Sequence, residues 1–453
     1  MLFLNTFVNK ISFPIIAKRD GMANLFKQLN QFEESQYWSE IKILEYQFIQ
    51  IKKLLIHAYQ YTEFYKNRFD NIGFNPFAFR DLNELEKIPP LTKNDIKSNL
   101  DKMLANNFAE NEIHRDATGG STGSHTPFYR NNSCLELKKA IEFRCNRWTG
   151  WKPGDKIAFY WPAIQDFNKK QSLKSRIKNT LSSRALMLYS GSLNKEVLEG
   201  HYRELALFKP SIIRAFPNPL SILANYIKET NKKRIHIPSI LSVGEPLLES
   251  HRKLFMDVFK SNVFNCYVSR ECGNMACECK EHKHLHINAE MVYTEFAKDK
   301  DKDHIPKKKI LITDLANYGM PFIRYQIEDM GTPVKKGCSC GRSLPLISMD
   351  TGRCSDFLLS PFDKSKISGC SFLHYMIADG PEVGQIQVIQ DKLDHIILKI
   401  VKSNNFSEEK LIYFDTLIKD IFHGKMNYDI EYPNKIDHEK SNKYMFTKCL
   451  VNQ

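Results

Sequence analysis

The sequence predicts an α/β fold, in which a large N-terminal domain has parallel sheets covered by helices and a small C-terminal domain is α+β. From about residue 135 to residue 270, short apolar, β-branched segments alternate with helix-like segments. This alternation is typical of a parallel sheet covered on both faces. After Gly352-Arg353 the pattern becomes a mixture of strands, one amphipathic helix and a basic tail. We therefore expect a helical part of the large domain over 1–110, its core over 111–353 and a C-terminal lid over 354–453.

The first region is predicted to be mainly helical. Residues 36–69 carry apolar and aromatic side chains at helical spacing, so this segment is expected to lie against a core. Pro89-Pro90 would then stop a helix, and Thr92 would serve as the N-cap of the next one.

The core and the lid follow from local patterns. Helix-like segments precede strand-like ones in the core, with the helices at 135–148, 200–208, 219–229 and 249–259 and the strands at 155–163, 210–216, 237–246 and 262–269. Longer β-segments are expected over 285–296 and 307–319. The lid is expected to hold a strand, a helix and a strand at 395–401, 407–422 and 428–432. Ligands of such parallel sheets bind beyond the carboxyl ends of the strands, where the motifs described below fall.

Composition excludes several classes of protein. The chain has 453 residues with 42% hydrophobic and 26% charged residues, which excludes disordered and collagen-like chains. No apolar run approaches the ~18 residues of a membrane span, and the first 20 residues lack a clear cleavage site for a secretory signal. The net charge of +13 suits a protein that handles anions, but no arginine-rich tract indicates nucleic acid. Eleven cysteines in such a chain favour metal ligation or reduced thiols, so we expect a cytoplasmic location.

The first candidate site is a segment of glycines and hydroxyl side chains, Thr118-Gly119-Gly120-Ser121-Thr122-Gly123-Ser124. Glycines let the backbone approach an anion closely, while hydroxyls and amides donate hydrogen bonds to phosphate oxygens. Neither a P-loop nor a Rossmann motif is present in the sequence. The alternative interpretation is a flexible linker.

Three further motifs contain groups that could bind a nucleotide. Tyr267 and Glu271 follow an apolar strand, so the ring could stack on a base and the acid could hold Mg²⁺. Asp329 follows a β-segment and could accept hydrogen bonds from both ribose hydroxyls. Arg353 and Asp356 lie at the junction of the two domains. The alternative for Tyr267 and Glu271 is an ordinary strand end with a surface ion pair. For Asp329 it is a solvated aspartate in a turn, and for Arg353 and Asp356 it is a plain turn between the domains.

In this order the motifs resemble the adenylate-forming superfamily, and within it the phenylacetate–coenzyme A ligase/CapK family. The resemblance runs from about residue 85 to the C-terminus and is strongest at "TGGSTG", "SVGEPL", "YVSRECGNMACEC", "LITDLANYGMPFIRYQIEDMG", "CSCGRSLP" and "TGRCSD". It implies a large ATP-binding domain and a C-terminal domain that moves between two half-reactions. The implied activity is ATP- and Mg²⁺-dependent adenylation of a carboxylic acid, followed by transfer to a thiol of coenzyme A or a carrier protein, in polysaccharide or secondary-metabolite biosynthesis.

The resemblance assigns roles to particular residues. Residues 118–123 would hold the β- and γ-phosphates, Gly244, Glu245 and Pro246 would lie beside adenine, and Tyr267 would stack on it. Glu271 would bind Mg²⁺, and Asp329 and Arg353 would contact the nucleotide. Asp356 would be the hinge, and Lys443 would be the catalytic lysine that bridges the carboxylate and the α-phosphate.

Chemistry explains why these residue types are needed, because a carboxylate that attacks an α-phosphate approaches another anion. Charge neutralisation is therefore the main demand on the site. Three departures from the family pattern bear on turnover. No lysine follows the glycine segment at 124–127, Glu328 replaces a glycine before Asp329, and Asn442 replaces a glycine before Lys443. Without the resemblance, Lys443 would be read as a solvated lysine of the tail.

A structural zinc site is expected in an excursion over about 266–342. Cys279, His282, Cys338 and Cys340 supply four ligands for tetrahedral Zn²⁺ with no open position, and related CapK-type sequences look similar here. The alternative is buried free cysteines and a surface histidine. The rival ligands are His284 and His286, of which His286 is expected to point into the sheet, and Cys272 and Cys277.

The sequence says less about the thiol that accepts the acyl group and about the carboxylic acid substrate. Five basic residues with no acid among them, Lys169, Lys170, Lys174, Arg176 and Lys178, could dock an acyl carrier protein or coenzyme A, although a solvated loop is the simpler interpretation. Tyr160, Trp161, Phe216 and Pro217 could line an acyl pocket or belong to the core. Two alternatives to an acid–thiol ligase are adenylyl transfer without a thioester and a non-catalytic nucleotide-binding scaffold.

Overall fold

The computed structural model describes most of the chain, in two compact units. The first unit lies within residues 1–118, 126–153 and 264–351, and the second within residues 154–263 and 352–453. The described residues are 2–117, 126–162, 173–191, 193–297, 308–349, 357–364, 366–369, 372–373, 376, 383–402, 406–408, 411–434, 436 and 447–451.

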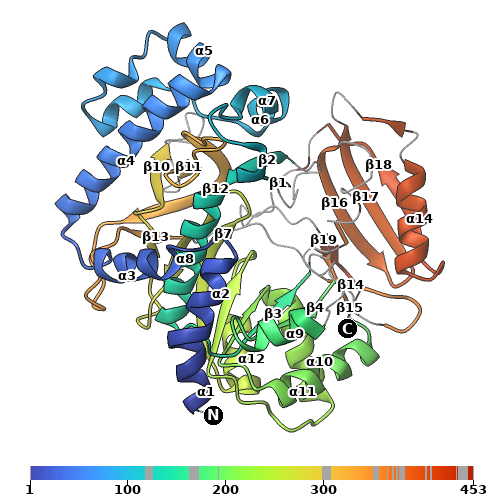
Figure 1. The fold of residues 1–453 in the computed structure, drawn as a ribbon. Helices are drawn as coiled ribbons and strands as arrows, with labels where there is room; N and C mark the ends of the chain where they lie inside the picture. Colours follow the sequence, from blue (N-terminus) through green and yellow to red (C-terminus); the bar gives the residue numbers. More distant parts are fainter. Residues whose placement is uncertain are drawn as a thin grey trace. The chain divides into compact units, whose positions relative to one another are not determined.

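The first unit opens with helices (Figure 1), as the sequence predicts. The segment 36–69 forms two helices, because Thr62 has extended backbone angles and its side chain accepts a hydrogen bond from the Tyr65 N–H, which starts the second helix. Its helices are α1 (Leu2–Phe7), α2 (Phe13–Arg19), α3 (Leu25–Ser35), α4 (Glu40–Tyr61), α5 (Glu63–Asn71), α6 (Lys93–Ser98), α7 (Leu100–Met103) and α8 (Asn132–Trp148), with a π-helical turn at Val8–Ser12 and 3₁₀ turns at Pro76–Ala78, Leu82–Lys87 and Glu110–Glu112.

Thr92 is the N-cap of α6, as predicted. Its hydroxyl accepts a hydrogen bond from the Asp95 N–H at 3.1 Å, and the Asp95 carboxylate accepts one from the Thr92 N–H at 2.9 Å. This reciprocal pair satisfies two of the N–H groups that a helix start leaves without partners.

The strands of the first unit pair antiparallel in the order β10-β11-β12-β13-β9-β8-β7. The longer β-segment expected over 285–296 is divided into two strands, β9 and β10, and the one expected over 307–319 is a strand, β11, that ends at Asp314. The strands are β7 (Asn262–Ser269), which enters this unit at residue 264, β8 (Gly273–Glu278), β9 (Leu285–Ile287), β10 (Val292–Ala297), β11 (Lys308–Asp314), β12 (Tyr325–Val334) and β13 (Leu346–Ser348).

A separate hairpin, β1 (Ile113–Ala117) and β2 (Pro127–Asn131), brackets the glycine segment. Its antiparallel register pairs Ala117 with Pro127. Ala117 and Pro127, which flank this part of the sequence, therefore lie opposite each other.

The second unit contains the predicted parallel sheet, in the order β6-β5-β3-β4. Side chains of α10, α11 and α12 form an apolar core with these strands, and Figure 1 shows the three helices grouped against them. The alternation did not predict β4, an edge strand whose residues are mostly half-buried. The elements are β3 (Ile157–Trp161), α9 (Leu173–Thr180), β4 (Ala185–Tyr189), α10 (Lys195–Phe208), β5 (Ile212–Ala215), α11 (Pro217–Glu229), β6 (Ser239–Val243) and α12 (Glu249–Phe259).

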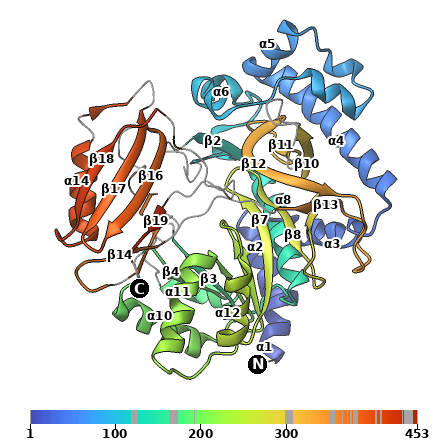
Figure 2. The same cartoon turned by 180° about the vertical axis from the view of Figure 1, so that it is seen from behind.

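The C-terminal part of the second unit is a four-stranded sheet in the order β18-β17-β16-β19, with α14 against one face (Figure 2). Phe414 and Ile418 of α14 are fully buried in the core that this helix shares with β16 and β17. The predicted strand, helix and strand are all present. The elements are β14 (Phe357–Leu359), β15 (Lys366–Ser368), β16 (Val383–Lys392), β17 (His395–Lys402), α14 (Leu411–Ile421), β18 (Asn427–Glu431) and β19 (Thr447–Cys449).

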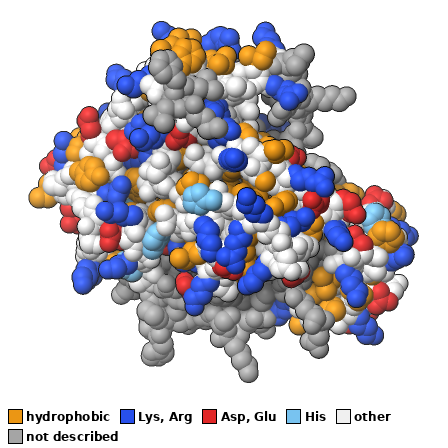
Figure 3. Space-filling model, turned by 90° about the horizontal axis from the view of Figure 1, so that it is seen from below, with side chains coloured by type: hydrophobic (Ala, Val, Ile, Leu, Met, Phe, Trp, Pro, Cys, Tyr) orange, Lys and Arg blue, Asp and Glu red, His pale blue; other side chains and the backbone are white. Residues whose placement is uncertain are grey.

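Among the described residues, no helix combines the length and the apolar character needed to cross a bilayer. Lys and Arg side chains are frequent on the face shown in Figure 3, in keeping with the net charge of +13.

Candidate functional site

Two tyrosine–carboxylate hydrogen bonds connect the β7 turn with β12 in the first unit. The Tyr267 hydroxyl donates to Oδ2 of Asp329 at 2.8 Å, and the Tyr325 hydroxyl donates to Oε1 of Glu271 at 2.9 Å. Glu271 is 7% exposed, so most of this residue is buried. Three of the residues predicted to bind the nucleotide and its metal are therefore gathered around one pair of β-segments.

A buried lysine fixes the backbone at Glu271. The Lys138 ammonium, on α8, donates to the Glu271 carbonyl and to Oδ2 of Asp314 at 2.7 Å. Burial alone lowers the pKa of Lys138, but the adjacent Asp314 carboxylate, together with Cys134 and Cys272, more than offsets this and raises the pKa above its usual value. The lysine therefore stays charged and holds the turn that carries Glu271.

The hairpin that brackets the glycine segment is joined to the same turn. Asp116, the penultimate residue of β1, accepts a hydrogen bond from Arg270 Nε at 3.1 Å and also pairs with Arg130 of β2. Arg270 directly precedes Glu271. The end of β1 that leads into the glycine segment therefore lies beside the predicted magnesium ligand. Two guanidinium groups on one carboxylate leave a net positive charge at this base, which suits a polyanionic ligand.

In the second unit, Gly244 and Glu245 follow β6. Gly244 has a φ of +76°, and a Cβ there would lie 2.4 Å from the Phe216 ring, so no other residue fits without displacing Phe216. Glu245 is 9% exposed and accepts a hydrogen bond from the Asn218 N–H, at the start of α11, at 3.2 Å. Its other oxygen, Oε1, has no hydrogen-bond partner among the described residues.

Burial makes Glu245 sensitive to pH. Burial raises the pKa of this carboxyl from 4.5 to about 7, although the hydrogen bond from Asn218 opposes the rise. Between these values the unfolded chain ionises while the folded chain stays protonated, so the stability that the neutral acid contributes is lost as the pH rises from about 4.5 to about 7. Glu245→Gln is expected to remove this loss, on the order of 3 kcal/mol between pH 4.5 and pH 8.

Thermal unfolding at pH 5 and pH 8 measures this difference. The exposed acid Glu249 at the start of α12 is the matched control, and Glu249→Gln should keep the wild-type pH dependence. A Glu245→Gln protein that loses as much stability as wild type between the two pH values would contradict the assignment.

Three of the predicted zinc ligands come together in the first unit, with a different histidine. Potential ligand atoms of Cys279, His286, Cys338 and Cys340 all lie within 4.8 Å of one another. Sγ of Cys279 is 3.6 Å from Sγ of Cys338, close to the ~3.8 Å edge of a tetrahedron with metal–sulfur bonds of about 2.3 Å. Nε2 of His286 is 3.3 Å from Sγ of Cys340. Burial lowers the pKa of His286 to about 4, so the ring is neutral and has a lone pair to offer.

His282, the predicted fourth ligand, lies outside this group. Its ring contacts Phe264 at 4.6 Å between centroids, and its Nδ1 is 3.3 Å from Glu278 Oε2. His286 takes its place because β9 pairs with β13 so that His286 lies opposite Leu346, only a few residues beyond Cys340. Strand alternation predicted that the His286 side chain points into the sheet. The side chain is indeed buried, and the residues it is buried against include the cysteines.

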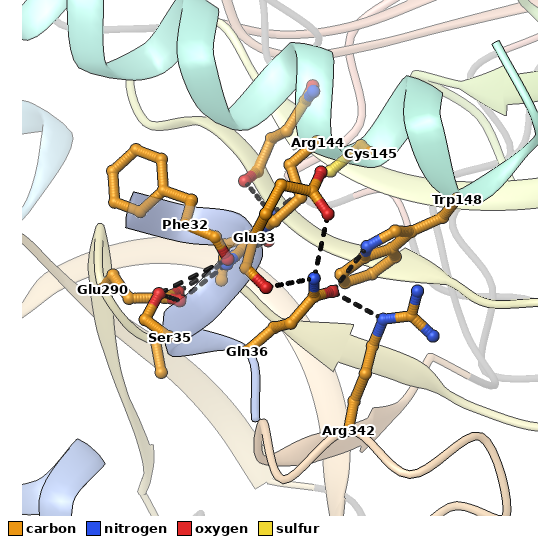
Figure 4. Close-up of polar contacts among 12 residues, drawn as sticks. Phe32, Glu33, Ser35, Gln36, Arg144, Cys145, Trp148, Glu290 and Arg342 are labelled. Carbon is orange, nitrogen blue, oxygen red and sulfur yellow. Dashed lines mark hydrogen bonds and ion pairs between the residues drawn. The ribbon is translucent and has the colours of Figure 1, made fainter. Parts of the chain in front are cut away.

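Hydrogen bonds and a ring contact link this group to the helices around it. Figure 4 shows Gln36, after α3, between two side chains of other segments: its Oε1 accepts hydrogen bonds from Trp148 Nε1 at 2.9 Å and from Arg342 Nε at 2.7 Å. Arg342 follows Cys340 by two residues, and the Trp148 ring contacts His286 edge-on at 5.6 Å. The cysteine loop is therefore anchored to both α3 and α8.

The remaining predicted residues are the candidates for the acyl pocket, the basic residues near α9 and the positions that the structure does not describe. Tyr160 is fully buried in the core of the second unit, with its hydroxyl 3.1 Å from His201 Nδ1, while Trp161 and Phe216 meet edge-on at 5.0 Å beside Pro217. Lys174 and Arg176 are exposed on α9, and Lys178 is half-buried. The positions that lie outside the described residues are 118–125, Lys169, Lys170, Arg353, Asp356 and Lys443.

Sequence reasoning missed the residues that support the site. Lys138, Asp314 and Arg270 act through partners 133 to 176 positions away in the chain, so no local pattern marks them. Tyr325 did leave a signal, because it stands in the quoted motif "FIRYQIEDMG" four residues before Asp329.

Comparison with known proteins agrees with these features. A family model described as the CapK C-terminal domain matches residues 359–449. Protein CapK of Staphylococcus aureus is 24% identical over 438 residues, which cover 92% of this chain and 93% of CapK. A phenylacetate–coenzyme A ligase of Thermus thermophilus is 24% identical over 68% of this chain and 70% of its own length.

Solved structures show the same fold. A 2-hydroxyisobutyryl-CoA ligase, in complex with 2-HIB-AMP and CoA, matches with a TM-score of 0.62 at 16% identity over 92% of this chain and 93% of the ligase. Its post-adenylation state matches with a TM-score of 0.58 at 15% identity, over 91% of this chain and 90% of the ligase. The predicted fold class is therefore confirmed, and this coenzyme A ligase has the same fold. The sequence matches add that the chain is similar to CapK and to a phenylacetate–coenzyme A ligase over two thirds or more of its length.

Proposed function

We propose that the protein is an adenylate-forming acid–thiol ligase. A carboxylate oxygen of the substrate would attack the α-phosphorus of ATP and release pyrophosphate. The thiolate of coenzyme A would then attack the acyl carbon, and AMP would leave with the electrons of the broken C–O bond. The relatives named as coenzyme A ligases support this reaction, and coenzyme A is the thiol that their names favour over a carrier protein.

The observation that carries the proposal is the pairing of Tyr267 with Asp329 and of Glu271 with Tyr325, in the order in which the family places its nucleotide ligands. Glu271 would hold Mg²⁺, which would neutralise phosphate charge, and Asp329 would accept the ribose hydroxyls. Lys138 and Arg270 would keep the Glu271 turn in place. Arg353, Asp356 and Lys443 keep their predicted roles as nucleotide contact, hinge and catalytic lysine.

We also propose a structural zinc ion on Cys279, His286, Cys338 and Cys340. The four donors leave no position for a substrate, and the site lies in a loop that Arg342 ties to Gln36. The metal would hold the β9–β13 region together, and it would take no part in the adenylation chemistry.

A pyrophosphate-release screen over aryl, fatty and amino acids tests the proposed reaction. At least one acid should stimulate ATP-dependent pyrophosphate release, and coenzyme A should then discharge the acyl-adenylate. Lys443→Ala should lose acid-dependent ATP–pyrophosphate exchange while still binding ATP, because the lysine would act on the reacting phosphate. Exchange without any thioester product would favour adenylyl transfer, and ATP binding without exchange for any acid would favour a scaffold.

A further inference from the structure

A second sulfur cluster lies in the first unit, apart from the proposed zinc ligands. Cys145 of α8, Cys266 of β7 and Cys277 of β8 place their sulfur atoms within 4.8 Å of one another. Cys266 and Cys277 are direct cross-strand partners in the β7–β8 register, and α8 contributes the third thiol. The cluster therefore arises from three elements that the fold brings together.

The cluster is dry and its surroundings are ordered. Cys145 and Cys277 are 0% exposed and Cys266 is 2% exposed. The Asn288 amide donates to Cys145 Sγ at 3.5 Å and to the Asn274 carbonyl at 2.7 Å, which fixes its orientation. An N–H group aimed at a sulfur atom is the kind of outer partner that stabilises a metal-bound thiolate.

A buried ion pair, Arg144 with Glu290, also lies next to the cluster. Figure 4 shows Cys145 following Arg144 on α8, and this guanidinium is fully buried. Arg144 also donates to the side chain of Asn288, so the arginine and the amide that faces Cys145 form one network. The charge of Arg144 is balanced by Glu290, so this network contributes to the cluster by orienting the Asn288 amide that faces Cys145.

We propose that Cys145, Cys266 and Cys277 bind a thiophilic d¹⁰ cation, Cu(I) or Zn²⁺, in a three-sulfur site. Soft thiolate ligands select these cations, and sulfur atoms around a planar three-coordinate ion with bonds of about 2.3 Å lie about 4 Å apart, within the separation found here. Each thiol that coordinates releases its proton to the solvent. The site is independent of the adenylation reaction and of the four residues proposed to bind zinc.

Metal counting on the full-length protein tests the site. The protein is purified under reducing, oxygen-free conditions, saturated with Zn²⁺, and then exposed to Cu(I) from a competing chelator. Wild type is expected to hold two cations per chain. Cys277→Ser should lose one of them, and Cys338→Ser should lose the other. The Cu(I) and Zn²⁺ arms show which ion the three-sulfur site prefers.

Cys134 provides the matched control, because it is fully buried on the same helix as Cys145 but belongs to neither group. Cys134→Ser should keep both cations. If Cys277→Ser does not fold, X-ray absorption of wild type decides the matter, since the second ion should have a shell of three sulfur atoms and no nitrogen. A cation count in Cys277→Ser equal to that of wild type, or the absence of a three-sulfur shell from wild type, would overturn the proposal, whereas a single cation that Cys277→Ser loses would count against the four-residue zinc site alone.

Discussion

Replacing Glu271 with glutamine is expected to lower acid-dependent ATP–pyrophosphate exchange by about 10²–10³, the usual cost of losing one preorganised charge at a reacting phosphate or oxyanion. The amide has nearly the same shape, and its oxygen can still accept the hydrogen bond that Tyr325 donates to Oε1 at 2.9 Å. The Lys138 contact goes to the backbone carbonyl of residue 271 and is unaffected. The variant therefore removes the negative charge and leaves the turn in place.

Glu278 is the matched control for this variant. It is also a buried acid in the β7–β8 hairpin, where it accepts a hydrogen bond from the Asn265 N–H at 2.9 Å and lies beside His282. Glu278→Gln should keep wild-type exchange and the wild-type dependence on Mg²⁺ concentration. If Glu271→Gln keeps full exchange with an unchanged Mg²⁺ requirement, Glu271 is not the metal ligand, and the acid must be sought elsewhere.

Much of the fold could be predicted because it depends on local patterns. The parallel strands of the second unit are short apolar segments between amphipathic helices, and Thr92 is recognisable as an N-cap from its own neighbours. The edge strand β4 (Ala185–Tyr189) shows the limit of this reasoning. Its five residues are apolar throughout, and periodicity alone does not distinguish so short an apolar segment from part of a helix.

The site was less predictable, because spacing along the chain does not give distance in space. Cys279 and His282 have the spacing of a ligand pair, yet His282 lies against Phe264, and strand pairing brings His286 to the cysteines instead. Lys138 reaches Glu271 from a helix 133 residues earlier. Residues that bind ligands stood out by type and motif, whereas the residues that hold them in place required the tertiary structure.

Replacing Arg144 with methionine is expected to destabilise the first unit by about 3–5 kcal/mol, the cost of breaking a buried ion pair by removing one partner. Figure 4 shows its setting, in which two guanidinium nitrogens bond to the two carboxylate oxygens of Glu290 at 2.6 and 2.9 Å. Arg144 also donates to the Phe32 carbonyl at 2.9 Å, which ties α8 to α3. The variant would leave Glu290, with a side chain only 2% exposed, as a buried charge whose remaining side-chain donor is Ser35.

A double-mutant cycle separates the ion pair from simple packing loss. Arg144→Met together with Glu290→Met should cost less than the sum of the two single variants, because two apolar side chains leave neither charge buried alone. Hydrogen exchange of the α8 amides is the measurement, since it reports the opening of this unit whatever the second unit does. Lys139→Met is the control on the same helix: its ion pair with Glu142 is partly exposed, so its loss should cost less than about 1 kcal/mol. Additive costs for Arg144 and Glu290 would mean that each side chain stabilises the unit by itself, because coupled charges cannot be removed independently.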